Sequence, residues 1–283
     1  WDNRQMVEQL EPRIPWIFNL APLVGLVATI SILLYIPVGG FPPLFSWAGD
    51  VILVLYLLII PSLAMVIGGF SSGSPYAIVG AQREMATMIA YEFPLAIILI
   101  SLAWKLIQIG GGNVFTLSTI AATPIWNNVT GPLGFIGFII LLLILVIVTP
   151  AELSKIPFDA PEAETEIAGG LLVEYSGRNL AMFYLTDGVK TIAMASIIVA
   201  LFFPYNISNL IDLGVYVGYI ADILFYLLKI FLVILFSVTL IRVGIARLKI
   251  DQIVYTYWIP LTLLSLVGLI LIMWDGLIAN LWG

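Results

Sequence analysis

The chain has 283 residues, of which 61% are hydrophobic and 10% charged, and its formal net charge is −6. Soluble globular domains carry about 25% charged residues, so this chain has too few polar side chains to cover a water-facing exterior. The acidic balance gives no electrostatic basis for binding nucleic acid. The absence of Cys and His excludes disulfides, iron–sulfur ligation and His- or Cys-based zinc and haem sites. We therefore expect no metal site and no redox cofactor in this chain.

Seven apolar segments are long enough to span a lipid bilayer, whose hydrocarbon core of ~30 Å takes about 20 residues of helix. They predict an all-α integral membrane protein with a single polytopic domain over residues 1–283. The third segment is the longest and carries charges, and an acidic loop at 150–178, with an amphipathic helix, follows the fourth. A short turn of helix is expected at 117–121. The segments are 17–36, 51–69, 76–109, 133–149, 180–203, 216–241 and 254–274.

Basic residues gather before the first segment and in every second loop, whereas the intervening loops contain no Lys or Arg. The positive-inside rule therefore predicts a multi-pass protein of the cytoplasmic membrane whose acidic loop faces the cytoplasm. Lys105 is the one basic residue near the outer ends, where we expect it to extend toward the interface. Asp50 and Asp275, also at outer ends, are expected to be solvated. The basic set is Arg4, Arg13, Arg83, Lys155, Arg178, Arg242, Arg247 and Lys249.

The acidic loop concentrates carboxylates between two apolar segments. Asp159 followed by Pro161 is typical of a helix start, where the Asp side chain accepts from a free backbone N–H. Glu162 and Glu166, four residues apart, would share a helix face and repel one another. Such crowding suits either proton sharing or docking of a soluble subunit. The acids of this loop are Glu152, Asp159, Glu162, Glu164, Glu166 and Glu174.

Ionisable residues inside the apolar segments cost about 3 kcal/mol each on insertion scales and indicate functional sites. Glu92 lies 16 residues into the third segment, which makes it a candidate for a proton relay. Arg83 and Glu84, near the start of that segment, fit either the polar path or a solvated interface.

The fifth and sixth segments each carry an acid and a Lys on one helix face. Asp187 and Lys190 fit a relay as well as they fit a neutralising pair. Lys229 lies deeper in its segment than Asp222 and needs a partner or water. A line of protonatable groups is therefore expected to run from the acidic loop into the third, fifth and sixth segments.

Two blocks of the sequence resemble the NuoH family, the membrane subunit at the junction of respiratory complex I that is shared with energy-converting nickel–iron hydrogenases. The Pro161-Glu162-Ala163-Glu164 run is more similar to the hydrogenase branch than to quinone-using complex I. The first block is Gly68–Ala77, Gly80–Glu84 and Tyr91-Glu92, and the second is Ala151-Glu152, Pro157–Asp159, Pro161–Glu166 and Val173–Gly177.

The resemblance implies a non-catalytic membrane-anchor and coupling subunit of an oxidoreductase complex. It would link electron transfer from ferredoxin and proton reduction in a peripheral arm to proton or sodium translocation. The nickel–iron centre and iron–sulfur clusters would lie in partner subunits: the hydrogenase large and small subunits and an iron–sulfur subunit. Antiporter-like and small membrane subunits would be further partners.

The family's acidic loop positions correspond to Glu152, Asp159, Glu162, Glu164, Glu166 and Glu174, and Glu92 corresponds to the acid of its tilted third span. With Asp187, Lys190 and Lys229 these form the predicted relay. The predicted interface with the peripheral arm is formed by Arg83, Glu84, Lys155, Phe158 and Arg178.

Two features depart from the family pattern. Relatives usually carry one more N-terminal span and an Arg-x-Gly-Pro segment, neither of which occurs in residues 1–283. Lys155 replaces an Arg common before Pro-Phe-Asp and loses its bidentate fork. Within the same architecture, a sulfane sulfur reductase or a quinone-reducing complex I are alternatives. A stand-alone secondary transporter is the alternative of another class, although no inverted repeat is evident.

Overall fold

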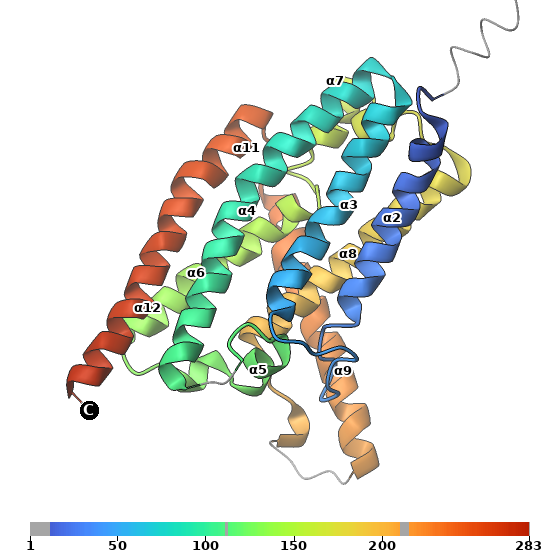
Figure 1. The fold of residues 1–283 in the computed structure, drawn as a ribbon. Coiled ribbons are helices and arrows are strands. Elements are labelled where there is room, and N and C mark those ends of the chain that lie inside the picture. The colour runs from blue at the N-terminus through green and yellow to red at the C-terminus, as the bar shows by residue number, and fades with distance from the viewer. Residues whose placement is uncertain (1–11, 111–112, 210–214, 283) are drawn as a thin grey trace, which may run out of the picture.

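The computed structural model describes residues 12–110, 113–209 and 215–282, which form long helices packed side by side (Figure 1). Within these residues, seven helices are long and apolar enough to cross a membrane. Each coincides with a predicted segment, so the all-α membrane fold is confirmed. Arg4, used in the orientation argument, lies outside the described residues.

The spanning helices differ in how regular they are. Five are continuous: α2 (Pro15–Leu33), α3 (Asp50–Ser72), α4 (Pro75–Ile109), α6 (Pro132–Glu152) and α8 (Gly177–Phe202). The last two are assembled from pieces: α9 (Val215–Ile234), η5 (Leu235–Thr239) and α10 (Leu240–Gly244), then α11 (Ile250–Thr256), η6 (Tyr257–Leu261) and α12 (Thr262–Trp282). The predicted turn of helix is confirmed as α5 (Leu117–Ala122), which is followed by η1 (Ile125–Asn128).

The bundle is apolar on both its inside and its outside, as lipid solvation requires. Its core lies where α4, α6 and α8 meet, around side chains such as Ile98, Phe138 and Leu145 that are fully buried. Helix α2 packs along α3 and α8, and α12 packs against α6 and α4. Glycine allows one of these close approaches. A Cβ atom on Gly137 of α6 would lie 3.0 Å from the carbonyl oxygen of Gly268 in α12, as expected of small residues at membrane helix contacts.

The two composite helices each contain one π-helical turn. The turns are η5 and η6, and they lie on either side of the connection at 245–249. In η6 the Tyr257 hydroxyl donates to the carbonyl of Ile147 at 2.8 Å, and its ring meets Phe158 edge-on at 5.2 Å between centroids. Single π-helical turns inside α-helices are frequent at functional sites.

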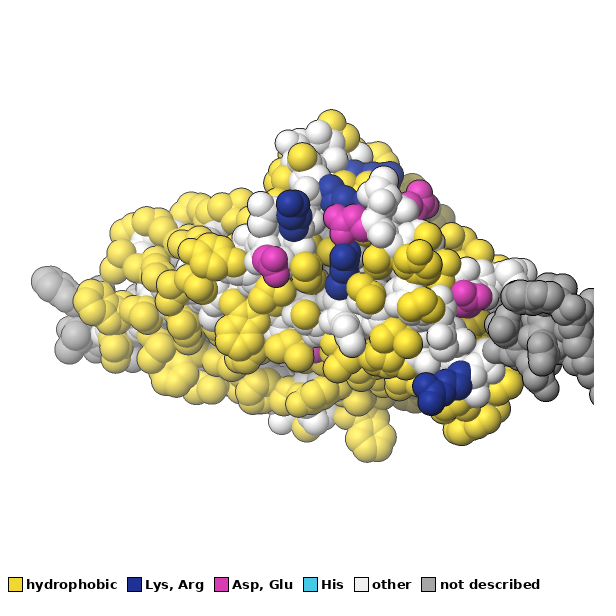
Figure 2. Space-filling view, turned by 90° about the horizontal axis from the view of Figure 1, so that it is seen from above, with side chains coloured by type: hydrophobic (Ala, Val, Ile, Leu, Met, Phe, Trp, Pro, Cys, Tyr) yellow, Lys and Arg dark blue, Asp and Glu magenta, His cyan; other side chains and the backbone are white. Residues whose placement is uncertain are grey.

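The bundle has two polar ends, which we call the loop end and the opposite end. The loop end carries residues 153–176, and the opposite end carries α5, the connection at 34–49 and residues 203–209. Figure 2 shows the loop end, where basic and acidic side chains gather within a mostly hydrophobic surface. The side of the membrane that each end faces stays a prediction.

At the opposite end, Asp50 and Asp275 are buried, not solvated as the sequence suggested, and so is Lys105. Lys105 donates to Asp275 at 3.1 Å, and both side chains are almost fully buried. Thr130 donates to the same carboxylate at 2.8 Å. Asp50 accepts from the backbone N–H of Leu117 at 2.6 Å and so holds the start of α5. These acids are stable inside the protein because it supplies hydrogen-bond donors in place of water.

The acidic loop does not form the single amphipathic helix that was expected. It consists of three short pieces: η2 (Ala160–Glu162), α7 (Glu164–Ile167) and η3 (Gly170–Leu172). It packs tightly on α4, as Gly80 shows. A Cβ atom added to Gly80 would lie only 2.8 Å from both the nitrogen of Leu171 and the carbonyl oxygen of Pro161. The loop backbone therefore rests directly on the helix.

We predict that Gly80→Ala destabilises the chain by about 1–3 kcal/mol, because the added methyl group forces the loop backbone away from α4. The melting temperature of the purified chain in detergent would fall, and protease would cut the loop faster. Gly188→Ala in α8 is the matched control, since a Cβ atom there meets nothing within 4 Å. Equal stability of the two variants would contradict the tight packing.

Candidate functional site

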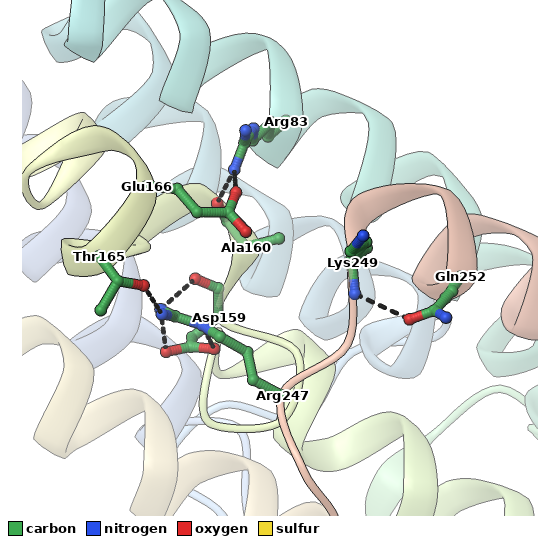
Figure 3. A network of polar contacts seen from close by, with 8 residues as sticks. All are labelled: Arg83, Asp159, Ala160, Thr165, Glu166, Arg247, Lys249 and Gln252. Atoms are coloured by element: carbon green, nitrogen blue, oxygen red, sulfur yellow. Dashed lines mark hydrogen bonds and ion pairs between the residues drawn. The ribbon is translucent and has the colours of Figure 1, made fainter.

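Two arginines hold the acidic loop on the helix bundle (Figure 3). Arg247 donates Nε to Asp159 Oδ1 at 2.8 Å and Nη2 to Oδ2 at 2.6 Å, the bidentate geometry that favours Arg over Lys. Arg83 donates to Glu166 at 2.6 Å and to the carbonyl of Ala160 at 3.2 Å. The connection at 245–249 and helix α4 are thereby tied to the same loop.

These contacts correct two expectations. The Asp159 side chain makes no capping hydrogen bond at the start of η2, because its carboxylate is engaged by Arg247. Glu162 and Glu166 do not share a helix face, since they lie in η2 and α7, which are separate. Glu166 is exposed and pairs with Arg83, and this pairing lowers the pKa of its carboxyl below the ordinary value.

The predicted Asp187–Lys190 pair is replaced by two pairs that cross from α8 to the end of α6. Lys155 pairs with Asp187 in a half-buried contact. Lys190 Nζ lies 2.9 Å from Glu152 Oε1, with both side chains almost fully buried. Asp187 and Lys190 are three residues apart on α8, and their partners Lys155 and Glu152 are also three residues apart. The two pairs therefore lie side by side.

A group of buried polar side chains lies beneath the loop, at the meeting point of α3, α4, α6 and α8. We call it the buried cluster; its members are Ser62, Glu84, Tyr91, Glu152, Ser154 and Lys190, all 7% exposed or less. Lys190 donates to Ser62 Oγ at 3.0 Å and to the carbonyl of Glu152 at 2.7 Å. Ser154 donates to Glu84 at 3.2 Å. Glu84 is therefore an interior acid, which corrects the reading of it as a solvated interface residue.

The buried cluster has more negative than positive groups. Glu84 and Glu152 together face one ammonium group, that of Lys190. The fully buried Tyr91 hydroxyl lies beside Glu152. An uncompensated charge in an apolar interior is costly, and a proton on one carboxylate removes it. The cluster can thus hold and release a proton.

Glu162 connects the loop to the buried cluster. It is half-buried in η2, and the charged groups that act on it are Asp187, Glu84, Lys155 and Asp159. Burial, with a smaller contribution from the neighbouring carboxylates, raises the pKa of Glu162 to about 8. Its carboxyl group can therefore exchange a proton near neutral pH.

Other candidate residues lie outside the buried cluster. Glu92 is half-buried on α4 and has no ion-pair partner among the described residues. Lys229 lies at the opposite end, where it donates to backbone carbonyls. Phe158 is buried beneath the loop against Tyr257. Three further candidates, Glu164, Glu174 and Arg178, are exposed at the loop end.

The sequence analysis did not single out Ser62, Tyr91 or Ser154. A signal was present for Tyr91, which adjoins Glu92, and for Ser62, a polar residue next to Pro61 in an otherwise apolar span. The described residues contain no group of three or more His, Cys, Asp or Glu side chains placed to hold a metal ion.

Comparison with known proteins gives concordant matches. The family model described as NADH dehydrogenase matches residues 8–273. One subunit of the NADH-quinone oxidoreductase of Geobacillus kaustophilus is 31% identical over 260 residues, which cover 90% of this chain and 72% of that protein. One subunit of the F(420)H(2) dehydrogenase of Methanosarcina mazei is 29% identical, and the match covers 89% and 72%, respectively. A chain of the membrane-bound sulfane sulfur reductase, an archaeal respiratory membrane complex, superposes with a TM-score of 0.73 at 26% identity and covers 90% and 79%.

We predict that Glu162 makes stability fall as pH rises. The folded chain retains a proton up to about pH 8, whereas the unfolded chain releases it near the ordinary pKa of 4.5. Between these values the native state binds more protons, so the free energy of unfolding declines with increasing pH. Melting curves between about pH 5 and about pH 8 should show a smaller decline in Glu162→Gln. The exposed neighbour variant Glu164→Gln should keep the wild-type slope, and a loss of slope there instead would exclude Glu162 as the source.

Proposed function

The chain belongs to the NADH dehydrogenase family, and we propose that it is the membrane-anchor and coupling subunit of an energy-converting oxidoreductase complex. Its relatives are membrane subunits of multi-subunit respiratory complexes, and the chain itself is a multi-pass membrane protein. Electron transfer would take place in partner subunits at the loop end. This chain would couple that electron transfer to the movement of protons or charge in the membrane.

The observation that carries the proposal is the buried cluster beneath the acidic loop, with Glu162 of the loop within electrostatic reach of Glu84. Glu162 lies in the loop, and its neighbour Glu84 is hydrogen-bonded within the cluster. Glu152 and Lys190 continue it toward α8. A proton entering at Glu162 would find acceptors in succession, and the position of Lys190 would decide which carboxylate keeps it.

The exposed part of the loop would form the docking surface for the soluble arm. Glu164 and Glu174 are exposed and make no ion pair among the described residues. Arg178 extends the surface at the start of α8. A partner that contacts Glu164 and Glu174 would also displace Asp159 and Glu166, because the same short loop carries these four acids.

The finer proposal is a ferredoxin-dependent nickel–iron hydrogenase complex, supported by the Pro161–Glu164 run. Its large subunit would hold the nickel–iron centre, and the small and iron–sulfur subunits would hold the clusters. Antiporter-like and small membrane subunits would complete the membrane arm and move protons or sodium. A sulfane sulfur reductase is the second candidate, favoured by the likeness to that complex at a TM-score of 0.73.

The test of the complex is its composition after mild solubilisation of membranes with an affinity tag on this chain. Iron–sulfur subunits with nickel and hydrogen evolution would support the hydrogenase. Iron–sulfur subunits without nickel, with reduction of sulfane sulfur or quinone, would move the assignment to those relatives. Recovery of the chain alone, with solute transport in vesicles, would refute the coupling role.

We predict that Glu152→Gln uncouples the complex. The variant keeps the shape of the side chain but cannot exchange a proton, so electron transfer would continue while the ion gradient built in vesicles falls on the order of 100-fold. Gradient formation and turnover of the electron acceptor are measured on the same vesicles. Asp251→Asn, an exposed acid of α11 outside the loop, is the control. An unchanged gradient per electron in Glu152→Gln would rule out the buried cluster as the relay.

A further inference from the structure

Lys229 differs from the other basic residues that are removed from solvent. Among the described Lys and Arg side chains, six are buried or half-buried, and five of these have a carboxylate within 4.0 Å. Lys229 is the sixth, and no described carboxylate lies that close to it. The five paired residues are Arg83, Lys105, Lys155, Lys190 and Arg247.

Neutral groups hold the Lys229 amine in place. Nζ donates to the carbonyls of Phe203 at 2.9 Å and Tyr205 at 2.7 Å, which follow the C-terminal end of α8. It also lies 4.9 Å from the centre of the Phe225 ring. The nearest acid along α9, Asp222, accepts instead from the N–H and hydroxyl of Ser208 at 2.9 and 2.6 Å. The carbonyls orient the ammonium but carry no net charge, and the nearby Asp222 carboxylate acts on it from beyond 4.0 Å without forming an ion pair.

This ammonium lines a cavity of about 250 Å³ at the opposite end of the bundle. The segment at 37–43, α5, the end of α8 and helix α9 form its walls. Apart from Lys229 the lining is mostly apolar, with side chains such as Phe41, Ala121, Ala200 and Tyr226. A half-buried cation against apolar walls fits a ligand that is anionic at one end and hydrocarbon at the other.

The exposed side of α9, the helix that carries Lys229, is apolar. Leu224, Leu227 and Leu228 are exposed on this helix, which is the spanning helix with the smallest buried share. In a bilayer these side chains face lipid, so hydrocarbon chains leaving the cavity would stay in an apolar environment.

We propose that this cavity binds an anionic membrane phospholipid, with its phosphate on Lys229 and the first part of its hydrocarbon chains against the apolar walls. Charge complementarity selects the phosphate, since one Lys near a membrane surface contributes about 1 kcal/mol toward anionic lipid. The walls select a lipid over free phosphate. The bound lipid would join the segment at 37–43, α8 and α9, which meet at this cavity.

The experiment measures lipid binding by native mass spectrometry on the full chain, purified within its complex and stripped of lipid. Phosphatidylglycerol, the diacylglycerol with the same chains and inorganic phosphate are titrated separately. Phosphatidylglycerol should bind, and Lys229→Met should lower the affinity for phosphatidylglycerol about fivefold. Arg242→Met removes an exposed basic residue of α10, the same span, and should leave binding unchanged.

Because Lys229 also holds the end of α8, a second variant keeps the test independent of folding. Ala121→Leu fills the cavity without altering Lys229 and should weaken the binding of phosphatidylglycerol. The melting temperature of the lipid-stripped protein should stay unchanged. The proposal is overturned if diacylglycerol binds as tightly as phosphatidylglycerol, if inorganic phosphate competes at equal concentration, or if both variants bind like the wild type.

Discussion

A charge inside this bundle is stable only beside a group that neutralises it or donates to it, and this constraint shapes both polar ends. With lipid outside and an apolar core inside, water is not available to solvate a stray carboxylate or ammonium. The chain meets the constraint with contacts between segments that are distant in sequence, such as Lys105 with Asp275 and Arg247 with Asp159. The ion pairs therefore also specify which helices are neighbours.

The crossed pairs between α6 and α8 connect the surface of the loop with the interior. Lys155 and Glu152 are three residues apart, as are their partners Asp187 and Lys190. A displacement of the loop at Lys155 would act on α8 through Asp187, about one helical turn from the buried Lys190. In the proposed coupling role, the same part of the chain would contact a docked partner and hold the exchangeable proton.

The sequence predicted the spanning helices well because lipid imposes a single requirement, about 20 apolar residues in a row. It predicted charge partners poorly. A pair between Asp187 and Lys190 was one of two readings, because spacing along one helix is all that a sequence displays, and their actual partners come from residues 152–155. The sequence left the burial of Glu84 open and gave that of Asp275 wrongly, since their burial depends on Ser154 and Lys105, which are far away along the chain. The glutamates of the loop were recognised as a group. Their division into paired, half-buried and exposed acids depends on three short helical turns, which the spacing of the residues does not predict.

The π-helical turns in the last two spans have a consequence for the evolution of the chain. A π-helical turn holds an extra residue relative to an α-helical turn and absorbs it within the wider turn. Losing one residue from η5 or η6 would therefore restore α geometry with little rotation of the helix beyond it, whereas losing one from a regular α-helical turn would rotate that helix by about 100°. The connection at 245–249 lies between the two turns, and its Arg247 must still reach Asp159. Single-residue deletions in these two spans are therefore expected to be tolerated at the π-helical turns and not elsewhere in the spans.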